Sequence, residues 1–205
     1  MEWNLKDINF LYRPDVFTGS FSNDKMQARH LALQKEKIDA IYQHLASAPT
    51  ALDALSALHH LDHIQFLQNN IEIFRKQSSL EKAVLKLYRK YNSAFNSSGE
   101  PSVWYDLFNK CDANMFYDLG SPLPGDPITA YRGSVVGVQK GLCWTISKKK
   151  VTWFTERWKD TELGGGTIFS TSISRKDTLI YLGEDEDSEL IVSPEFLETA
   201  MITAL

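Results

Sequence analysis

The spacing of apolar residues predicts helices in the first part of the chain. Between residue 25 and about residue 117, apolar side chains recur at intervals of three and four, the period of an amphipathic helix. This pattern predicts one helix around residues 31–45 and another over 52–74. A third opens at residues 78–81, where Ser-Ser-Leu-Glu has the spacing of a capping box. The turn-forming run 96–101 ends the third helix, and a shorter helix over 103–108 follows.

The segment 120–127 marks the end of the helical pattern. Its three prolines lack backbone donors and fix φ, so neither a helix nor a central strand can run through it. Beyond it, short apolar runs predict strands at 128–131, 142–145, 167–173 and 189–192. Ser147 and Ser193-Pro194 have the chemistry of helix starts. We therefore expect an α+β fold, with a helical accessory region over 1–120 and a mixed-β core over 121–205.

Composition narrows the function classes. The 205 residues are 43% hydrophobic and 23% charged, as in an ordinary globular domain. Their net charge of −4 provides no general basic field, which argues against nucleic acid as a partner. A local patch, residues 148–150, is either a nucleic-acid contact or a solvated helix start. Two cysteines outside any Cys-x-x-Cys pair fit a reducing compartment. With no signal segment or membrane-length apolar run, we expect a cytoplasmic protein and no membrane partner.

Three strand-like segments each carry a polar residue that a core does not need. Arg132 is followed by Gly133, which would let a ligand approach the backbone, and its guanidinium can bind a phosphate with two parallel hydrogen bonds. Thr145 offers a hydroxyl beside the flat ring of Trp144. Glu189 directly precedes an apolar strand. The alternatives are an ion-paired surface arginine, a core tryptophan beside a strand threonine, and a solvated acidic loop over 184–187.

Two other patterns are weaker candidates. His59, His60 and His63 look like a metal cluster, yet no acidic or cysteine ligand has a recognised spacing to them. The triplet Ser170-Thr171-Ser172 is a polar run inside a predicted strand. No P-loop, Rossmann fingerprint or nucleophile elbow is present.

The order of the motifs in residues 128–194 resembles that of the ADP-ribosyltransferase family. The class in question carries an arginine motif, then a Ser-Thr-Ser motif, then a glutamate motif. The family's aromatic-Arg-Gly matches Tyr131-Arg132-Gly133, and its later acidic motif matches Asp187-Ser188-Glu189. Two stretches compete for the middle motif. Ser170-Thr171-Ser172 is the literal match, whereas Cys143-Trp144-Thr145 has the family's position before a helix that carries Val151 and Phe154. Position favours the second stretch, although both serines are replaced there. Asp187 is one methylene shorter than the family's glutamate, which puts arginine as the acceptor in doubt.

The resemblance implies NAD as the ADP-ribose donor and no metal. Arg132 would hold the diphosphate or adjoining ribose, and Thr145 would position Glu189. Glu189 would bind the ribose 2′-hydroxyl and stabilise positive charge as the nicotinamide bond breaks. Asp187 would orient or deprotonate the acceptor, while Tyr131, Trp144 or Phe154 would pack against the nicotinamide.

The resulting expectation is a mono-ADP-ribosyltransferase that modifies a protein target, of the kind found among phage or bacterial effectors. Two alternatives remain. One is an NAD glycohydrolase, which uses water as acceptor. The other is an inactive binding or inhibitor module on the same fold, with the helical half as its partner surface.

Overall fold

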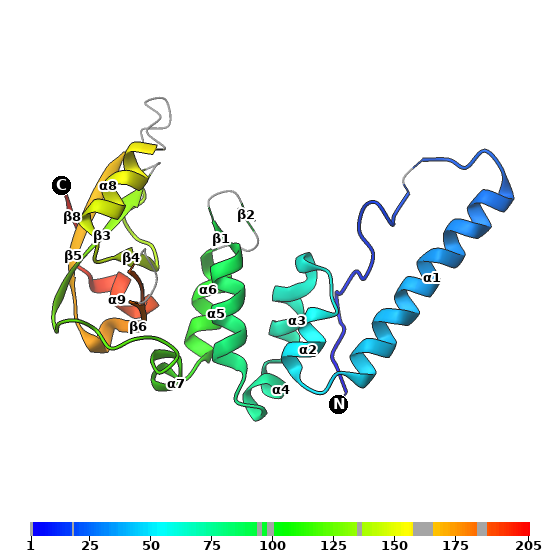
Figure 1. Cartoon of the computed structure of the whole chain (residues 1–205), viewed down its shortest axis with the longest axis horizontal. Helices are drawn as coiled ribbons and strands as arrows, with labels where there is room; N and C mark the ends of the chain where they lie inside the picture. Colours follow the sequence, from blue (N-terminus) through cyan, green and yellow to red (C-terminus); the bar gives the residue numbers. More distant parts are fainter. Residues whose placement is uncertain are drawn as a thin grey trace. The chain divides into compact units, whose positions relative to one another are not determined.

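The computed structural model describes residues 2–17, 19–93, 96–97, 101–134, 137–157, 166–183 and 188–205, with no side-chain placement at 91–93, 96–97, 101 and 157. The described residues form a mixed α+β structure, as predicted. Contacts divide the chain into two compact units, Met1–Trp104 and Tyr105–Leu205 (Figure 1). The division falls inside helix α6 (Pro101–Lys110), so the predicted linker at 120–127 lies within the second unit.

The first unit is built from helices. Its longest helix is α1 (Asp24–Ser47), and the Asn23 side chain caps it by accepting a hydrogen bond from the Met26 backbone N–H at 2.9 Å. The shorter elements are α2 (Ala51–Ser56), the 3₁₀ turn η1 (His60–Asp62), α3 (His63–Asn69), α4 (Ile71–Lys76), α5 (Leu80–Tyr91), and the two-residue strands β1 (Asn92–Ser93) and β2 (Asn96–Ser97).

The single helix predicted over residues 52–74 is wrong, because polar side chains interrupt it. His59 has an extended backbone, and its ring accepts a hydrogen bond from the Leu61 N–H at 3.3 Å. Asn70 leaves the helical conformation, and its side chain bonds the backbone of Asn4 at 2.8 and 3.0 Å. Side chains that bond nearby or distant backbone groups compete with helix propagation. The break also separates His59 from His63, which therefore do not share one helical face.

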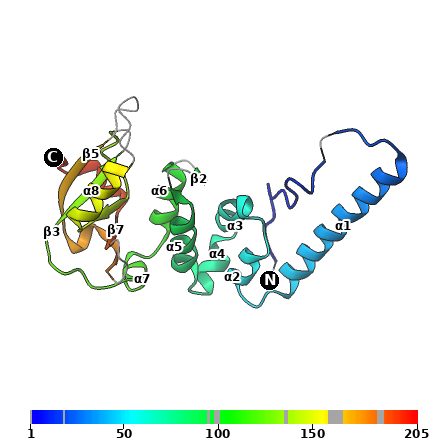
Figure 2. The same cartoon turned by 45° about the horizontal axis from the view of Figure 1, so that its top comes forward.

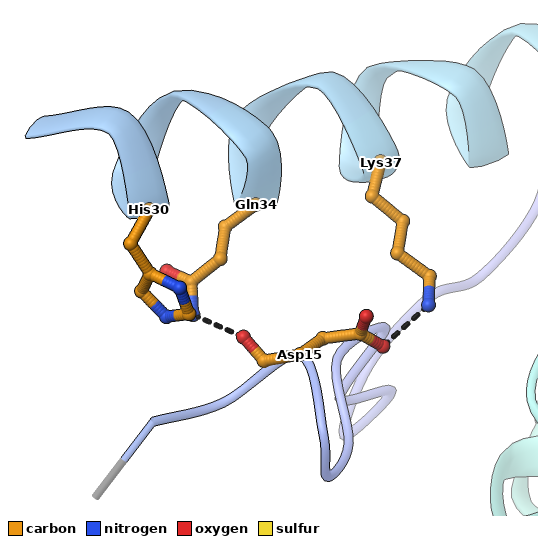
Figure 3. Close-up of polar contacts among 4 residues, drawn as sticks. All are labelled: Asp15, His30, Gln34 and Lys37. Atoms are coloured by element: carbon orange, nitrogen blue, oxygen red, sulfur yellow. Dashed lines mark hydrogen bonds and ion pairs between the residues drawn. The ribbon is translucent and has the colours of Figure 1, made fainter. Parts of the chain in front are cut away.

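Helix α1 has one buried residue, Leu45, and its apolar residues Leu31, Leu33 and Tyr42 are exposed. The N-terminal segment, residues 2–17, contacts this helix, and its Phe10 ring lies 5.2 Å from the Tyr42 ring between centroids. Figure 3 shows Gln34 donating to the backbone carbonyl of Asp15 at 2.8 Å, and Lys37 paired with the Asp15 carboxylate. The apolar period thus predicted the helix correctly but not which of its residues are buried.

The second unit is centred on a six-stranded sheet with the order β6-β7-β4-β3-β5-β8. All of its pairs are antiparallel, so the prediction of a mixed-β core is wrong on this point. The strands predicted at 128–131, 142–145, 167–173 and 189–192 are present with small shifts at their ends. Two edge strands were missed. The strands are β3 (Ile128–Ser134), β4 (Cys143–Thr145), β5 (Thr167–Ile173), β6 (Thr178–Leu182), β7 (Glu189–Val192) and β8 (Thr203–Ala204).

Helix α8 (Lys148–Arg157) packs against β3, β4 and β5, and Figure 2 shows it lying across the strands. Ser147 caps it, because its hydroxyl accepts from the Lys150 N–H at 3.2 Å. Ser193 caps α9 (Pro194–Thr199) in the same way. Helix α7 (Ala113–Tyr117) contacts β6, and the short 3₁₀ turn η2 (Arg175–Asp177) precedes that strand. The core includes Phe116, Trp144, Ile173, Ile180, Leu190 and Ile191.

Candidate functional site

The three segments singled out in the sequence lie on adjacent strands. Strand β4 pairs with β3 on one side and with β7 on the other. Tyr131 lies opposite Thr145, which lies opposite Glu189. Directly opposed residues in antiparallel strands project to the same face. Tyr131, Thr145 and Glu189 therefore form one row across the middle of the sheet, although 58 positions separate the first from the last (189 − 131).

Cys143 connects the predicted arginine to the predicted glutamate. An Arg132 Nη1 donates to the Cys143 backbone carbonyl at 2.9 Å, and the Cys143 thiol donates to Glu189 Oε1 at 3.0 Å. Cys143 is two residues before Thr145, so its side chain shares the face that carries Glu189. The sequence comparison assigned no role to this cysteine. The available signal was its even spacing from Thr145 on a strand.

Thr145 was predicted to position Glu189, and its hydroxyl also has a role in the local backbone. Its Oγ1 accepts a hydrogen bond from the Ser147 N–H at 3.0 Å and so shapes the turn between β4 and α8. The thiol that bonds the Glu189 carboxylate belongs to Cys143. Cys143 is therefore a second candidate for positioning Glu189, and the role predicted for Thr145 stays a prediction.

The Arg132 guanidinium lies against the backbone of the segment before β4. A Cβ on Gly141 would overlap it, so the glycine provides the room. Arg132 Nε is buried with no hydrogen-bond partner, and no carboxylate among the described residues forms an ion pair with this side chain. A buried polar group without a partner costs free energy unless a ligand or water satisfies it. This orphaned donor is the feature of Arg132 that fits an anionic ligand.

Arg132 and Glu189 leave their strands toward opposite faces. Arg132 lies opposite Phe169 on β5. Neighbouring residues of a strand project to opposite faces, so Arg132 projects away from the face that Tyr131 shares with Glu189. The two side chains are linked through the backbone and thiol of Cys143, and they do not touch directly. Their convergence on one cleft remains a prediction.

Two residues expected to line a cofactor site have packing roles instead. Trp144 is only 1% exposed, and its Nε1 donates to the Gly141 carbonyl at 2.7 Å, so its ring belongs to the core. The space in front of Gly133 is filled by α8, because a Cβ there would lie 2.8 Å from Thr155 Oγ1 and 3.0 Å from Phe154 Cδ1. Gly133 thus allows close helix–sheet packing. Phe154 is 36% exposed beside it and keeps a surface that a ligand can reach.

The backbone just before Glu189 is in an unusual conformation. Ser188 has φ +44°, in the left-handed region that L-residues rarely adopt. Its carbonyl accepts from the Ile146 N–H at 3.4 Å, which ties the start of β7 to the end of β4. Strained backbone of this kind persists where surrounding contacts over-determine it, often at functional sites. Asp187, predicted to orient the acceptor, lies outside the described residues.

The literal Ser-Thr-Ser triplet lies away from Glu189. Ser170, Thr171 and Ser172 belong to β5, which β3 and β4 separate from β7. Thr171 is buried and donates to the Met201 carbonyl at 2.9 Å, while Ser172 is exposed. The sheet order therefore agrees with the choice of Cys143-Trp144-Thr145 as the stretch beside Glu189.

The histidines have structural contacts. The His59 ring stacks on Tyr12 at 4.2 Å between centroids, and the His63 ring bonds the Leu58 carbonyl at 3.0 Å. Within the described ranges, no three His, Cys, Asp or Glu side chains gather in a metal-binding group. Among the same residues, no helix is both long and apolar enough to cross a membrane.

The chain was compared with models of known protein families, with curated proteins and with solved structures. None of the three comparisons found a match.

Proposed function

We propose that this protein is an NAD-dependent mono-ADP-ribosyltransferase that modifies a protein target. The observation that carries the proposal is the contact of Cys143 with both Arg132 and Glu189. The resemblance of the sequence motifs points to the same two side chains. Their attachment to one residue on the central strand β4 supports a common role.

The residues fit an anionic dinucleotide. The unpartnered Nε of Arg132 and the remaining guanidinium donors suit the diphosphate of NAD, for which guanidinium groups are preferred ligands. NAD would supply the ADP-ribosyl group and nicotinamide as leaving group. Glu189 would accept the ribose 2′-hydroxyl proton in a hydrogen bond and stabilise the positive charge that develops on the sugar. Cys143 would hold the Glu189 carboxylate in place through its thiol.

Transfer of label from NAD to protein tests this function. The wild-type chain, incubated with NAD labelled in the adenylate part and a cell lysate, is expected to give labelled protein. Glu189→Gln should reduce the rate by at least tenfold, because the isosteric amide cannot stabilise the developing charge. Glu195→Gln, an exposed change on α9 in the same unit, is the matched control and should leave the rate unchanged.

The same assay separates the alternatives. Free ADP-ribose and nicotinamide without labelled protein would identify a glycohydrolase and contradict the transferase proposal. Demonstrated NAD binding with neither product would contradict catalysis and favour a binding module. A folded Glu189→Gln variant with full activity would remove the proposed role of Glu189.

Cys143 variants test the positioning role. Cys143→Ser keeps a hydrogen-bond donor toward Glu189, whereas Cys143→Ala removes it. We expect wild type and Cys143→Ser to have a higher kcat than Cys143→Ala. The KM for NAD should change little, because the donor acts through Glu189. Equal kcat values for the two variants would show that the thiol only fills space.

A further inference from the structure

The outward side of α8 carries an open hollow that the proposed reaction does not use. Its volume is about 530 Å³, and Lys148, Lys149, Thr152, Trp153 and Glu156 line it. These positions follow one another along a single helical stripe. The opposite side of α8 holds the buried residues Val151 and Thr155, which lie over Gly133. The hollow therefore faces away from the sheet. We call the five lining residues the α8 surface.

The lysines of the α8 surface do not stabilise the helix that carries them. Lys148, Lys149 and Lys150 occupy the first turn of α8, which contains no acidic residue. A helix N-terminus has a partial positive charge, so cations there are unfavourable by about 0.3–1 kcal/mol each. Within the described part of the chain, neither Lys148 nor Lys149 forms an ion pair. An anionic partner for these lysines would offset this cost.

Trp153 gives this surface an apolar anchor. It is 48% exposed, and the Lys150 ammonium lies 5.0 Å from the centroid of its ring. Tryptophan is enriched among the residues that contribute most of the binding energy at protein interfaces. Glu156 lines the same hollow and would repel a phosphodiester chain. The combination favours a protein segment with both acidic and apolar side chains over a nucleic acid.

We propose that the α8 surface docks an acidic, apolar segment of the protein that receives ADP-ribose. The identification of this partner as the acceptor rests on the proposed function. The charges are complementary, since a carboxylate-bearing segment would find three lysines at one helix end in a chain of net charge −4. The helix also begins directly after β4 and packs on β3, the strands that carry Cys143 and Arg132. Docking there would hold the acceptor on the element next to the site.

Fluorescence anisotropy with a labelled peptide of Glu-Leu-Phe repeats measures the docking directly. The full chain should bind this peptide, with affinity that falls as salt rises. Lys148→Glu combined with Lys149→Glu should weaken binding at least tenfold, and so should Trp153→Ala. The control combines Lys76→Glu with Lys176→Glu, at two other exposed lysines. It changes the net charge by the same amount and should leave the affinity for the peptide unchanged. The Lys148/Lys149 variant should also keep or raise Tm, because it removes unfavourable charge at the helix start.

The outcomes separate the docking surface from the chemistry. Glu189→Gln should bind the peptide as wild type does. In an active protein, the docking variants should reduce label transfer to protein without changing nicotinamide release into water. Failure of wild type to bind the peptide, or equal binding by the docking variants, would overturn the proposal. So would tighter binding of oligo(dT) with the same lysine dependence. Peptide binding without any NAD turnover would leave the docking surface standing and refute the proposed function.

Discussion

The two units use their buried polar groups differently. In the helical unit, these groups hold the N-terminal segment: Trp3 donates to the Leu45 carbonyl at 2.8 Å, and Tyr12 donates to the buried Asp62 carboxylate. In the sheet unit, the polar contacts of Arg132 and Glu189 involve partly exposed residues of neighbouring strands and meet at Cys143. Among the described residues, each unit also buries a polar atom without a hydrogen-bond partner, Asp62 Oδ2 in the first and Arg132 Nε in the second, so the contrast lies in what the bonded groups hold together. Substitutions can test each half of this contrast.

The largest expected effect comes from the sheet core. Trp144→Ala should lower the free energy of unfolding by about 3–5 kcal/mol, because it removes a fully buried ring and leaves a cavity. Leu31→Ala on α1 should change it by less than about 0.5 kcal/mol, since Leu31 is 56% exposed. Urea denaturation followed by circular dichroism measures both. A large cost for Leu31→Ala would show that α1 buries this face in solution.

Asp62 in the helical unit should give the next largest effect. This carboxylate is 2% exposed and accepts hydrogen bonds from the Asn9 N–H at 3.2 Å and from the Tyr12 hydroxyl. Asp62→Ala would leave both donors unpaired and should cost about 1–3 kcal/mol. Asp39→Ala, at an exposed position of α1, is the control in the same denaturation experiment. A cost no larger than that of the control would show that these contacts do not hold the N-terminal segment.

Local signals predicted the elements better than they predicted the packing. The helix caps at Ser147 and Ser193 and the central strands follow from side-chain chemistry within a few residues. The break between residues 52 and 74 depends partly on Asn70 bonding Asn4, which lies 66 positions away. No local period contains that contact. Strands β6 and β8 were missed for a related reason, since each is defined by its neighbour in the sheet.

The candidate site shows the same limit. The order of motifs predicted that Arg132, Thr145 and Glu189 matter together, and the sheet places their strands side by side. Which hydroxyl or thiol bonds the carboxylate depends on the register between β4 and β7, which the sequence alone leaves open. The register sets Cys143 diagonally from Glu189 and turns Trp144 into the core.

The buried histidine of the helical unit predicts a pH dependence. Burial lowers the pKa of His63, and burial together with the charge of His60 lowers the pKa of His59. The unfolded chain then binds these protons more tightly than the folded chain. The contribution of these histidines to the free energy of unfolding should be fully present above about pH 6.5. It should be lost as the pH drops through the lowered folded-state pKa values.

Thermal unfolding between pH 7.5 and pH 5 measures this effect. His63→Gln should flatten the dependence of Tm on pH, because it removes one of the two groups. His44→Gln, at an exposed position of α1, should leave the slope as in wild type. Equal slopes for all three proteins would assign the acid sensitivity to other groups.

The smallest effects are expected where the N-terminal segment meets α1 (Figure 3). The Asp15 carboxylate pairs with Lys37 at an exposed position, whereas the Asp15 carbonyl accepts a half-buried hydrogen bond from Gln34. Exposed ion pairs contribute about 0–1 kcal/mol because water and salt screen them, so Lys37→Ala should cost less than about 0.5 kcal/mol. Gln34→Ala should cost about 0.5–1.5 kcal/mol, since the carbonyl loses its partner. Repeating the denaturation in 1 M salt should leave the Gln34→Ala cost unchanged and erase that of Lys37→Ala. The reverse order would show that charge, and not backbone satisfaction, holds the segment on the helix.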